Sequence, residues 1–90
     1  MSHLTQNKTK LLARVRRLKG QLEAIERALE ADAPCGEVLN QVASVRGAVS
    51  GLTAELIESH LHEHVTGVAD ATVRETGAAE LLQAIRTYLR

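Results

Sequence analysis

Three histidines alternate near the end of a long helical segment, in the stretch "SHLHEH" at residues 59–64. Successive residues of an α-helix are turned by about 100°. His60 and His64 therefore share one face, whereas His62 points to the other side. Two imidazoles four residues apart commonly chelate a metal ion on a helix, but the same spacing is also common among solvent-exposed or capping histidines. The motif alone leaves both interpretations open.

Two more residues of metal-ligand type lie far from this motif in the sequence. His3 is close to the N-terminus, and Cys35 is the only cysteine of the chain. A single cysteine cannot form an intrachain disulfide, which fits a reducing compartment. In the simplest alternative Cys35 is a small buried hydrophobic residue and His3 belongs to a tail.

The chain contains no Phe and no Trp, so its core must consist mainly of aliphatic side chains. This composition predicts an all-α fold in a single domain, residues 1–90. Spacings of four and three residues predict two long helices, at roughly 6–30 and 34–64, and a third short helix from about residue 78. Asp32 is the expected N-cap of the second helix and Pro34 belongs to its first turn. Residues 65–77 are expected to form a loose linker. The apolar positions of the two long helices are Leu11, Val15, Leu18, Leu22, Ile25 and Leu29, and Val38, Val42, Val45, Val49, Leu52 and Leu56.

The second predicted helix is too long and too apolar to be covered by one neighbour, so we expect at least a dimer built on paired second helices. Cys35 lies 25 residues before His60, which is about 37 Å along a straight helix. The two cannot share an ion within one chain. Antiparallel pairing about a two-fold axis near Val49 would bring Cys35 of one protomer beside residues 60–64 of the other. Folding the first helix back at about residue 32 returns His3 to the same level. The expected site combines His3, His60 and His64 of one chain with Cys35 of its partner.

Positive charge is concentrated at one end of a chain whose net charge is zero. Residues 1–22 contain six basic residues and no acidic one, whereas residues 23–64 contain eight acidic residues against Arg27 and Arg46. Such a block can offer a basic surface to a polyanion; the alternative is an ordinary solvated helix face. The basic residues of the block are Lys8, Lys10, Arg14, Arg16, Arg17 and Lys19.

Other classes of protein fit the sequence less well. No apolar run approaches the roughly 20 residues of a membrane span, and the N-terminus is polar and then basic, so a cytoplasmic protein without membrane contact is expected. No acidic residue is placed to orient Cys35 in a recognisable catalytic arrangement, so we do not expect an enzyme. A metal buffer protein could use the same ligands but would not need the basic helix.

Several segments closely resemble the CsoR/RcnR family of bacterial metal- and formaldehyde-responsive repressors. They are "LLARVRRLKGQLEAIERALE", the lone Cys35, "VRGAVSGLTAELIESHLHEH" and "IRTYLR". The resemblance implies a three-helix protomer, a dimer of dimers, and a basic first helix that holds operator DNA until an inducer binds between protomers. It makes the six basic residues of residues 8–19 the expected residues that bind double-stranded DNA. Arg14 matches the family's DNA-contacting arginine, and Arg17 stands where Lys or Arg is usual.

The ligand pattern His3, Cys35, His60 and His64 resembles the nickel and cobalt branch of this family. Copper(I) sensors have a second cysteine where this chain has His64, and a thiolate suits that softer ion. Formaldehyde sensors pair the cysteine with an N-terminal proline amine, whereas residue 2 here is Ser. Imidazoles with one thiolate suit Ni(II) or Co(II), with Zn(II) as a further candidate. The main alternative is a formaldehyde-responsive repressor in which Cys35 is a nucleophile.

Overall fold

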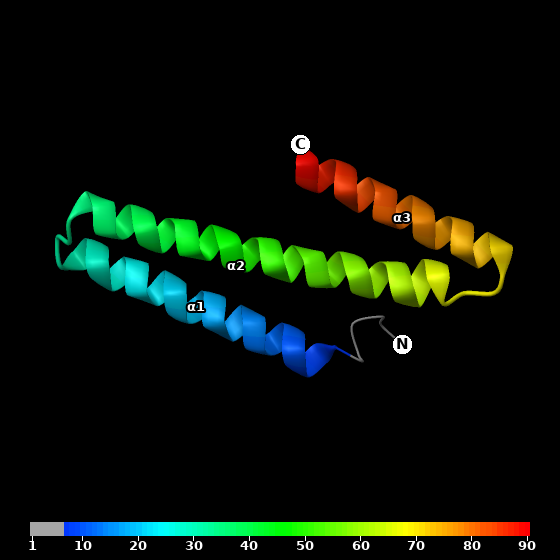
Figure 1. The fold of residues 1–90 in the computed structure, drawn as a ribbon, viewed down its shortest axis with the longest axis horizontal. Coiled ribbons are helices and arrows are strands. Elements are labelled where there is room, and N and C mark those ends of the chain that lie inside the picture. The colour runs from blue at the N-terminus through cyan, green and yellow to red at the C-terminus, as the bar shows by residue number, and fades with distance from the viewer. Residues whose placement is uncertain (1–6) are drawn as a thin grey trace. The chain divides into compact units, whose positions relative to one another are not determined.

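The computed structural model describes residues 7–90, which form three α-helices and one π-helical turn (Figure 1). In chain order these are α1 (Lys8–Glu30), α2 (Cys35–Leu61), η1 (His62–Thr66) and α3 (Ala71–Leu89). The described residues contain no β-strand, so the predicted all-α architecture of three helices is confirmed. The chain divides into two compact units, Lys8–Thr53 and Ala54–Arg90 together with Asn7.

The turn that ends α1 is a Schellman motif, in which one residue with left-handed backbone reverses the chain. Asp32 has a φ of 54°, and its amide donates to the Leu29 carbonyl at 3.2 Å. The amide of Ala33 donates to the Ala28 carbonyl at 2.9 Å. Both bonds satisfy carbonyls that the helix end would otherwise leave open. The prediction that Asp32 caps the second helix was therefore wrong, because this residue closes the first.

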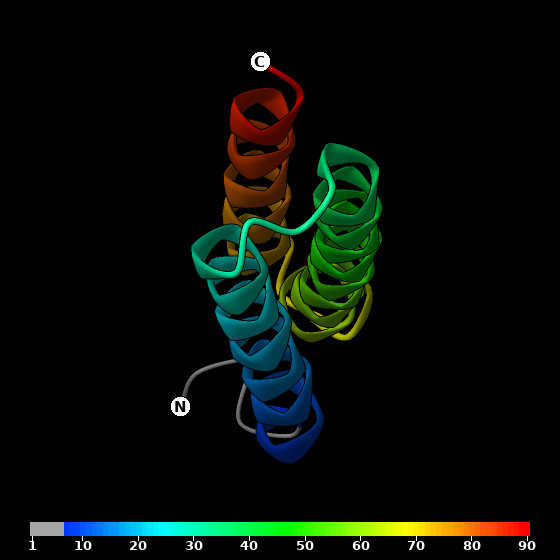
Figure 2. The same cartoon turned by 90° about the vertical axis from the view of Figure 1, so that its left-hand side faces the viewer.

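α2 begins directly after Pro34. The Pro34 carbonyl accepts hydrogen bonds from the amides of Glu37 and Val38, at 3.0 and 3.2 Å. Proline suits this place because it has no amide hydrogen to satisfy there. Figure 2 looks along the helices and shows the short connection from α1 to α2.

The α1–α2 hairpin leaves many apolar side chains uncovered in a single chain. Gln21 of α1 donates through Nε2 to the Ser44 hydroxyl of α2 at 2.9 Å. On α2, however, Leu39, Val42 and Val49 are 62%, 48% and 40% exposed. At about 25 cal/mol per Å² of apolar surface, covering such side chains would stabilise an assembly considerably.

α3 begins earlier than the sequence predicts. The Asp70 carboxylate accepts a hydrogen bond from the Val73 amide at 2.9 Å and caps the helix. Arg74 donates from Nη1 to the carbonyls of Val68 and Ala69, at 3.1 and 3.2 Å. The expected loose linker over residues 65–77 was therefore wrong: only residues 67–70 separate η1 from α3.

α2 also ends differently from the predicted helix at 34–64. Its α-helical geometry stops at Leu61, and His62–Thr66 form a π-helix. The Gly67 amide donates to the His62 carbonyl, five residues back, at 2.9 Å. π-Helical turns are rare and are often found at functional sites.

No helix in residues 7–90 has the length and apolarity needed to cross a membrane.

Candidate metal site and basic surface

His60 and His64 lie side by side at the junction of α2 and η1. Their ring centroids are 4.9 Å apart and the ring planes are tilted by 40°. Both residues are half-buried. The convergence that the sequence spacing predicted is therefore present, although His64 belongs to the π-helical turn rather than to a continuous α-helix.

The backbone of α3 fixes the orientation of the His60 ring. Nε2 of His60 lies 2.8 Å from the Gly77 carbonyl oxygen. A carbonyl oxygen can only accept, so Nε2 must carry the hydrogen. In the neutral imidazole the lone pair is then on Nδ1, which is the nitrogen able to coordinate a metal ion. Histidine ligands commonly donate their other N–H to a carbonyl in this way.

Gly77 brings α3 against His64 and is buried. A Cβ on residue 77 would collide with the His64 carbonyl oxygen and would lie 2.8 Å from both C and Cβ of His64. Only glycine allows this approach, which also places the Gly77 carbonyl against His60. The sequence pattern did not reveal this role, because it placed Gly77 in a linker. A glycine inside a helical segment can mark such a close backbone approach.

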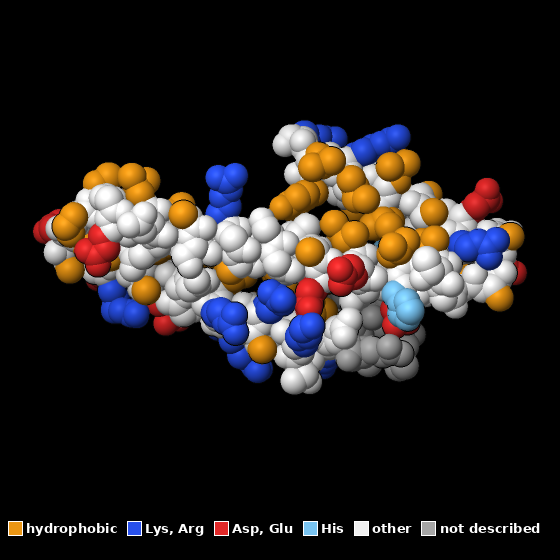
Figure 3. Space-filling model, in the orientation of Figure 1, with side chains coloured by type: hydrophobic (Ala, Val, Ile, Leu, Met, Phe, Trp, Pro, Cys, Tyr) orange, Lys and Arg blue, Asp and Glu red, His pale blue; other side chains and the backbone are white. Residues whose placement is uncertain are grey.

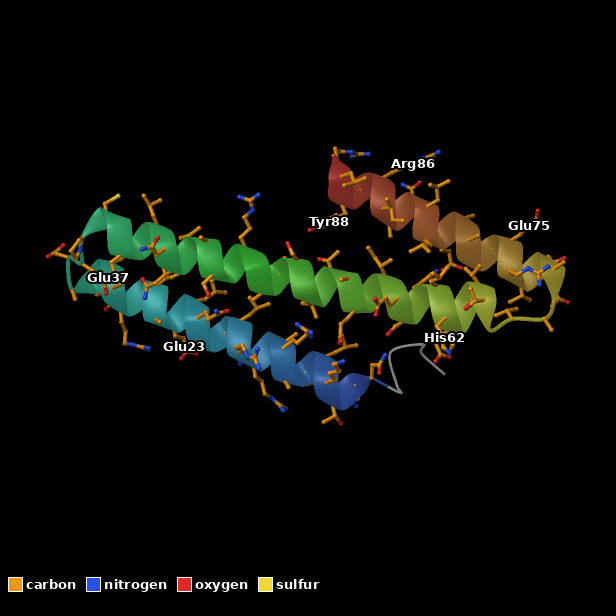
Figure 4. The ribbon with its side chains drawn as sticks, in the orientation of Figure 1. Glu23, Glu37, His62, Glu75, Arg86 and Tyr88 are labelled. Carbon is orange, nitrogen blue, oxygen red and sulfur yellow. The ribbon has the colours of Figure 1, made fainter. Side chains whose placement is uncertain are left out.

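His62 does not join the pair. Its side chain is exposed, and Figure 4 shows it on the side of the segment that faces away from α3. His60, in contrast, bonds to α3. Two of the three alternating histidines therefore converge, as the helical spacing predicted.

The structure does not place either of the other two predicted ligands beside this pair. Cys35 is exposed at the first residue of α2, and His3 lies outside the described residues. Asn7 is the nearest described residue to His3, and its Nδ2 donates to the Ser59 hydroxyl at 2.6 Å. Ser59 is only 5% exposed and immediately precedes His60. Asn7, which follows His3 by four positions in the sequence, is thus bonded to the residue next to His60.

The described residues supply two nitrogen ligands at one place but not a complete metal site. Among residues 7–90 no group of three or more His, Cys, Asp or Glu side chains could hold a metal ion. The imidazoles of His60 and His64 fit a borderline transition-metal ion, which usually takes four or more ligands. Any further protein ligands would have to come from the N-terminal residues or from a second protomer.

The six predicted DNA-binding residues all lie in the first half of α1. Figure 3 shows the Lys and Arg side chains that gather over this part of α1. Five of the six are exposed, and Arg14 is half-buried. The exposed residues are Lys8, Lys10, Arg16, Arg17 and Lys19. This group, with Arg14, is called the basic surface below.

Comparisons with known proteins agree with these features. Residues 7–87 match the family model described as metal-sensitive transcriptional repressor. An uncharacterized protein in the bioA 5′ region of Serratia marcescens is 51% identical, and the match covers all of both chains. The transcriptional repressor RcnR of Citrobacter koseri is 38% identical, again over the whole of both chains.

A solved structure shows the same fold. It is a Glu-to-His variant of the formaldehyde-responsive regulator FrmR from Salmonella enterica serovar Typhimurium. It is 45% identical, has a TM-score of 0.83, and the match covers 92% of this chain and 94% of the other. The chain thus belongs to the CsoR/RcnR family of metal-sensitive transcriptional repressors, which are regulators rather than enzymes.

Proposed function

We propose that this repressor binds double-stranded operator DNA through the basic surface of α1 and releases it when Ni(II) or Co(II) binds, with Zn(II) as a further candidate. The observation that carries the proposal is the pair of His60 and His64, whose ring centroids are 4.9 Å apart. The Gly77 carbonyl orients the ring of His60. A ring that is already oriented loses less freedom when it coordinates a metal ion, and this favours binding.

His3 of the same chain and Cys35 of a partner would complete the ligand set. His3 precedes Asn7 by four positions, and four successive Cα–Cα steps span up to about 14 Å. Because Asn7 is bonded to Ser59, His3 is within reach of His60. Cys35 begins the same helix that ends near His60, so only another protomer can bring its thiolate to the pair. A thiolate with imidazoles favours borderline metal ions over Ca²⁺ or Mg²⁺.

The assembly we propose is a dimer of dimers, in which α2 of one protomer packs antiparallel to α2 of its partner. The exposed apolar side chains of Leu39, Val42 and Val49 support this packing. Their spacings of three and seven residues keep them on one side of α2. Cys35 precedes Leu39 by four residues and continues the same side.

DNA binding by the basic surface would be mainly electrostatic. Each protomer offers six positive charges within residues 8–19 and no acidic residue among them. Binding to phosphates releases counterions, so operator affinity should fall steeply with salt. Sequence preference would then depend partly on the shape and deformability of the operator.

A hydrogen bond links the histidine pair to the start of the basic helix. Asn7 directly precedes Lys8, the first residue of α1, and donates to Ser59 beside His60. Coordination of a metal ion by His3 would restrain the residues that directly precede α1. This restraint would shift the basic surface away from its DNA-bound position. Couplings between two sites are typically about 1–3 kcal/mol, and identical sites in an oligomer add to the total.

A formaldehyde-responsive repressor is the second candidate. It is favoured by the likeness to a formaldehyde-responsive regulator and by the exposed thiol of Cys35, which a nucleophile requires. Ser2 weakens this candidate, because formaldehyde sensors of the family pair the cysteine with an N-terminal proline amine.

Mixing two inactive variants tests whether the metal site is shared between protomers. Cys35→Ala and His60→Ala should each bind metal poorly. In a mixed dimer one site contains the intact histidines of the first variant and the intact cysteine of the second. Random exchange in an equal mixture makes about half the dimers mixed. About a quarter of the wild-type sites should therefore return, measured by Co(II) absorption.

The same variants provide the control. An equal mixture of Cys35→Ala with wild-type protein should show no gain beyond the average of its two components. If the two variants regain nothing after full subunit exchange, the cysteine does not come from the partner, and the proposed shared site is wrong.

A further inference from the structure

Arg14 differs from the rest of the basic surface because it lies against α2. A Cβ built on Gly51 would be 2.8 Å from Nη1 and 3.8 Å from Cζ of Arg14. A side chain at position 51 would therefore displace the guanidinium, which is the movable end of a long side chain. Gly47, one turn earlier on the same helix, has nothing within 4 Å of its corresponding Cβ position.

We propose that Gly51 is a positioning residue for DNA binding: its missing side chain makes a seat on α2 that holds the guanidinium of Arg14 in place for a phosphate. This inference rests on the proposed role of the basic surface. It adds a residue on α2 that carries no charge and need not touch DNA.

The seat matters because arginine is a long side chain with many rotamers. Fixing a free arginine on DNA costs conformational entropy, and a guanidinium that already lies in position avoids part of that cost. The planar fork of arginine also requires a defined orientation for bidentate binding to a phosphate. Packing of Arg14 against α2 would both lower this entropy cost and fix the orientation of the guanidinium.

The contrast among the six cations supports the same conclusion. Lys8, Lys10, Arg16, Arg17 and Lys19 are exposed, whereas Arg14 is half-buried. Exposed side chains can adjust to the phosphate backbone after they reach it. The position of Arg14 is instead determined partly by α2, so a change on α2 can alter how a residue of α1 binds DNA.

The test compares Gly51→Ala with Gly47→Ala. Both substitutions add one methyl group to α2 and both raise helix propensity, but only the first meets Arg14. We expect Gly51→Ala to weaken operator binding roughly tenfold, the lower range for removal of a charge-assisted hydrogen bond. The slope of log affinity against log salt should become shallower by about 0.9 for each phosphate that the variant no longer neutralises. Gly47→Ala should match wild type in both measurements.

The Arg14→Ala background identifies the cause. Adding Gly51→Ala to Arg14→Ala should change operator affinity no further, because there is no guanidinium left to displace. Metal affinity, measured by chelator competition, should be the same for Gly51→Ala and Gly47→Ala.

Each contrary result has a distinct meaning. If Arg14→Ala weakens binding but Gly51→Ala and Gly47→Ala are alike, the seat has no role and this inference is wrong, while the proposed function stands. Tighter binding by Gly51→Ala would also overturn it, because Arg14 would then be restrained by α2 rather than presented. If Arg14→Ala itself leaves operator affinity unchanged, both the inference and the proposed use of Arg14 in DNA binding are wrong.

Discussion

Replacing Arg14 and Arg17 together with alanine is expected to weaken operator binding at least about 100-fold, because removing each charge-assisted hydrogen bond costs about 1.5 kcal/mol or more. Both residues lie in the basic surface of α1. The same bonds would be missing from several protomers of an oligomer at once, which increases the effect. Fluorescence anisotropy of a labelled operator fragment measures it, at two salt concentrations.

The control is Arg27→Ala. Arg27 is exposed in the last turn of the same helix, outside the basic block, and its removal should change operator affinity little. Metal affinity of the double variant should stay close to wild type, since neither arginine lies in the proposed ligand set. Unchanged operator affinity in the double variant would show that the basic surface is not the DNA-binding surface.

The second large effect is expected at the histidine pair. His60→Ala and His64→Ala should each lower metal affinity by more than tenfold, because removing a ligand should cost at least as much as removing a hydrogen-bond partner of a ligand, which is about 10 to 100-fold. His62→Ala should leave affinity unchanged, since His62 is exposed and lies on the side away from α3 (Figure 4). Competition with a chelator measures all three.

His60→Gln separates coordination from structure. A glutamine amide can still donate a hydrogen bond to the Gly77 carbonyl, which lies 2.8 Å from the ring nitrogen of His60, but it is a poor ligand for these ions. Its metal affinity should fall as in His60→Ala, while thermal unfolding stays nearer to wild type. The assignment of ligands would be wrong if His62→Ala proved as damaging as His60→Ala.

The periodicity of apolar residues was enough to predict the helices that depend on regular packing. α1 and α2 begin within two residues of the predicted positions, because repeated four- and three-residue spacings require one continuous apolar face. The pairing of His60 and His64 followed from the same geometry. In α1, α2 and the histidine pair, the spacing of residues in the sequence and their positions in the structure both follow the period of the α-helix.

The features that the sequence did not reveal depend on single interactions between segments. The seven residues 71–77 contain Thr, Val and Gly, which favour helices weakly, and the cap by Asp70 and the bonds of Arg74 make up for this. The π-helical turn and the role of Gly77 depend on how closely α3 approaches His64. Neither feature has a period that a sequence pattern can show.

The most direct test of a metal-responsive repressor is a titration of the protein–operator complex with Ni(II), Co(II), Zn(II) and formaldehyde in parallel, followed by anisotropy of the labelled DNA. The proposed function predicts that Ni(II) or Co(II) releases the operator at concentrations where formaldehyde has no effect. Release should be abolished in His64→Ala and kept in His62→Ala. If formaldehyde releases the operator and none of the ions does, Cys35 is a nucleophile rather than a ligand, and the metal-responsive function is contradicted.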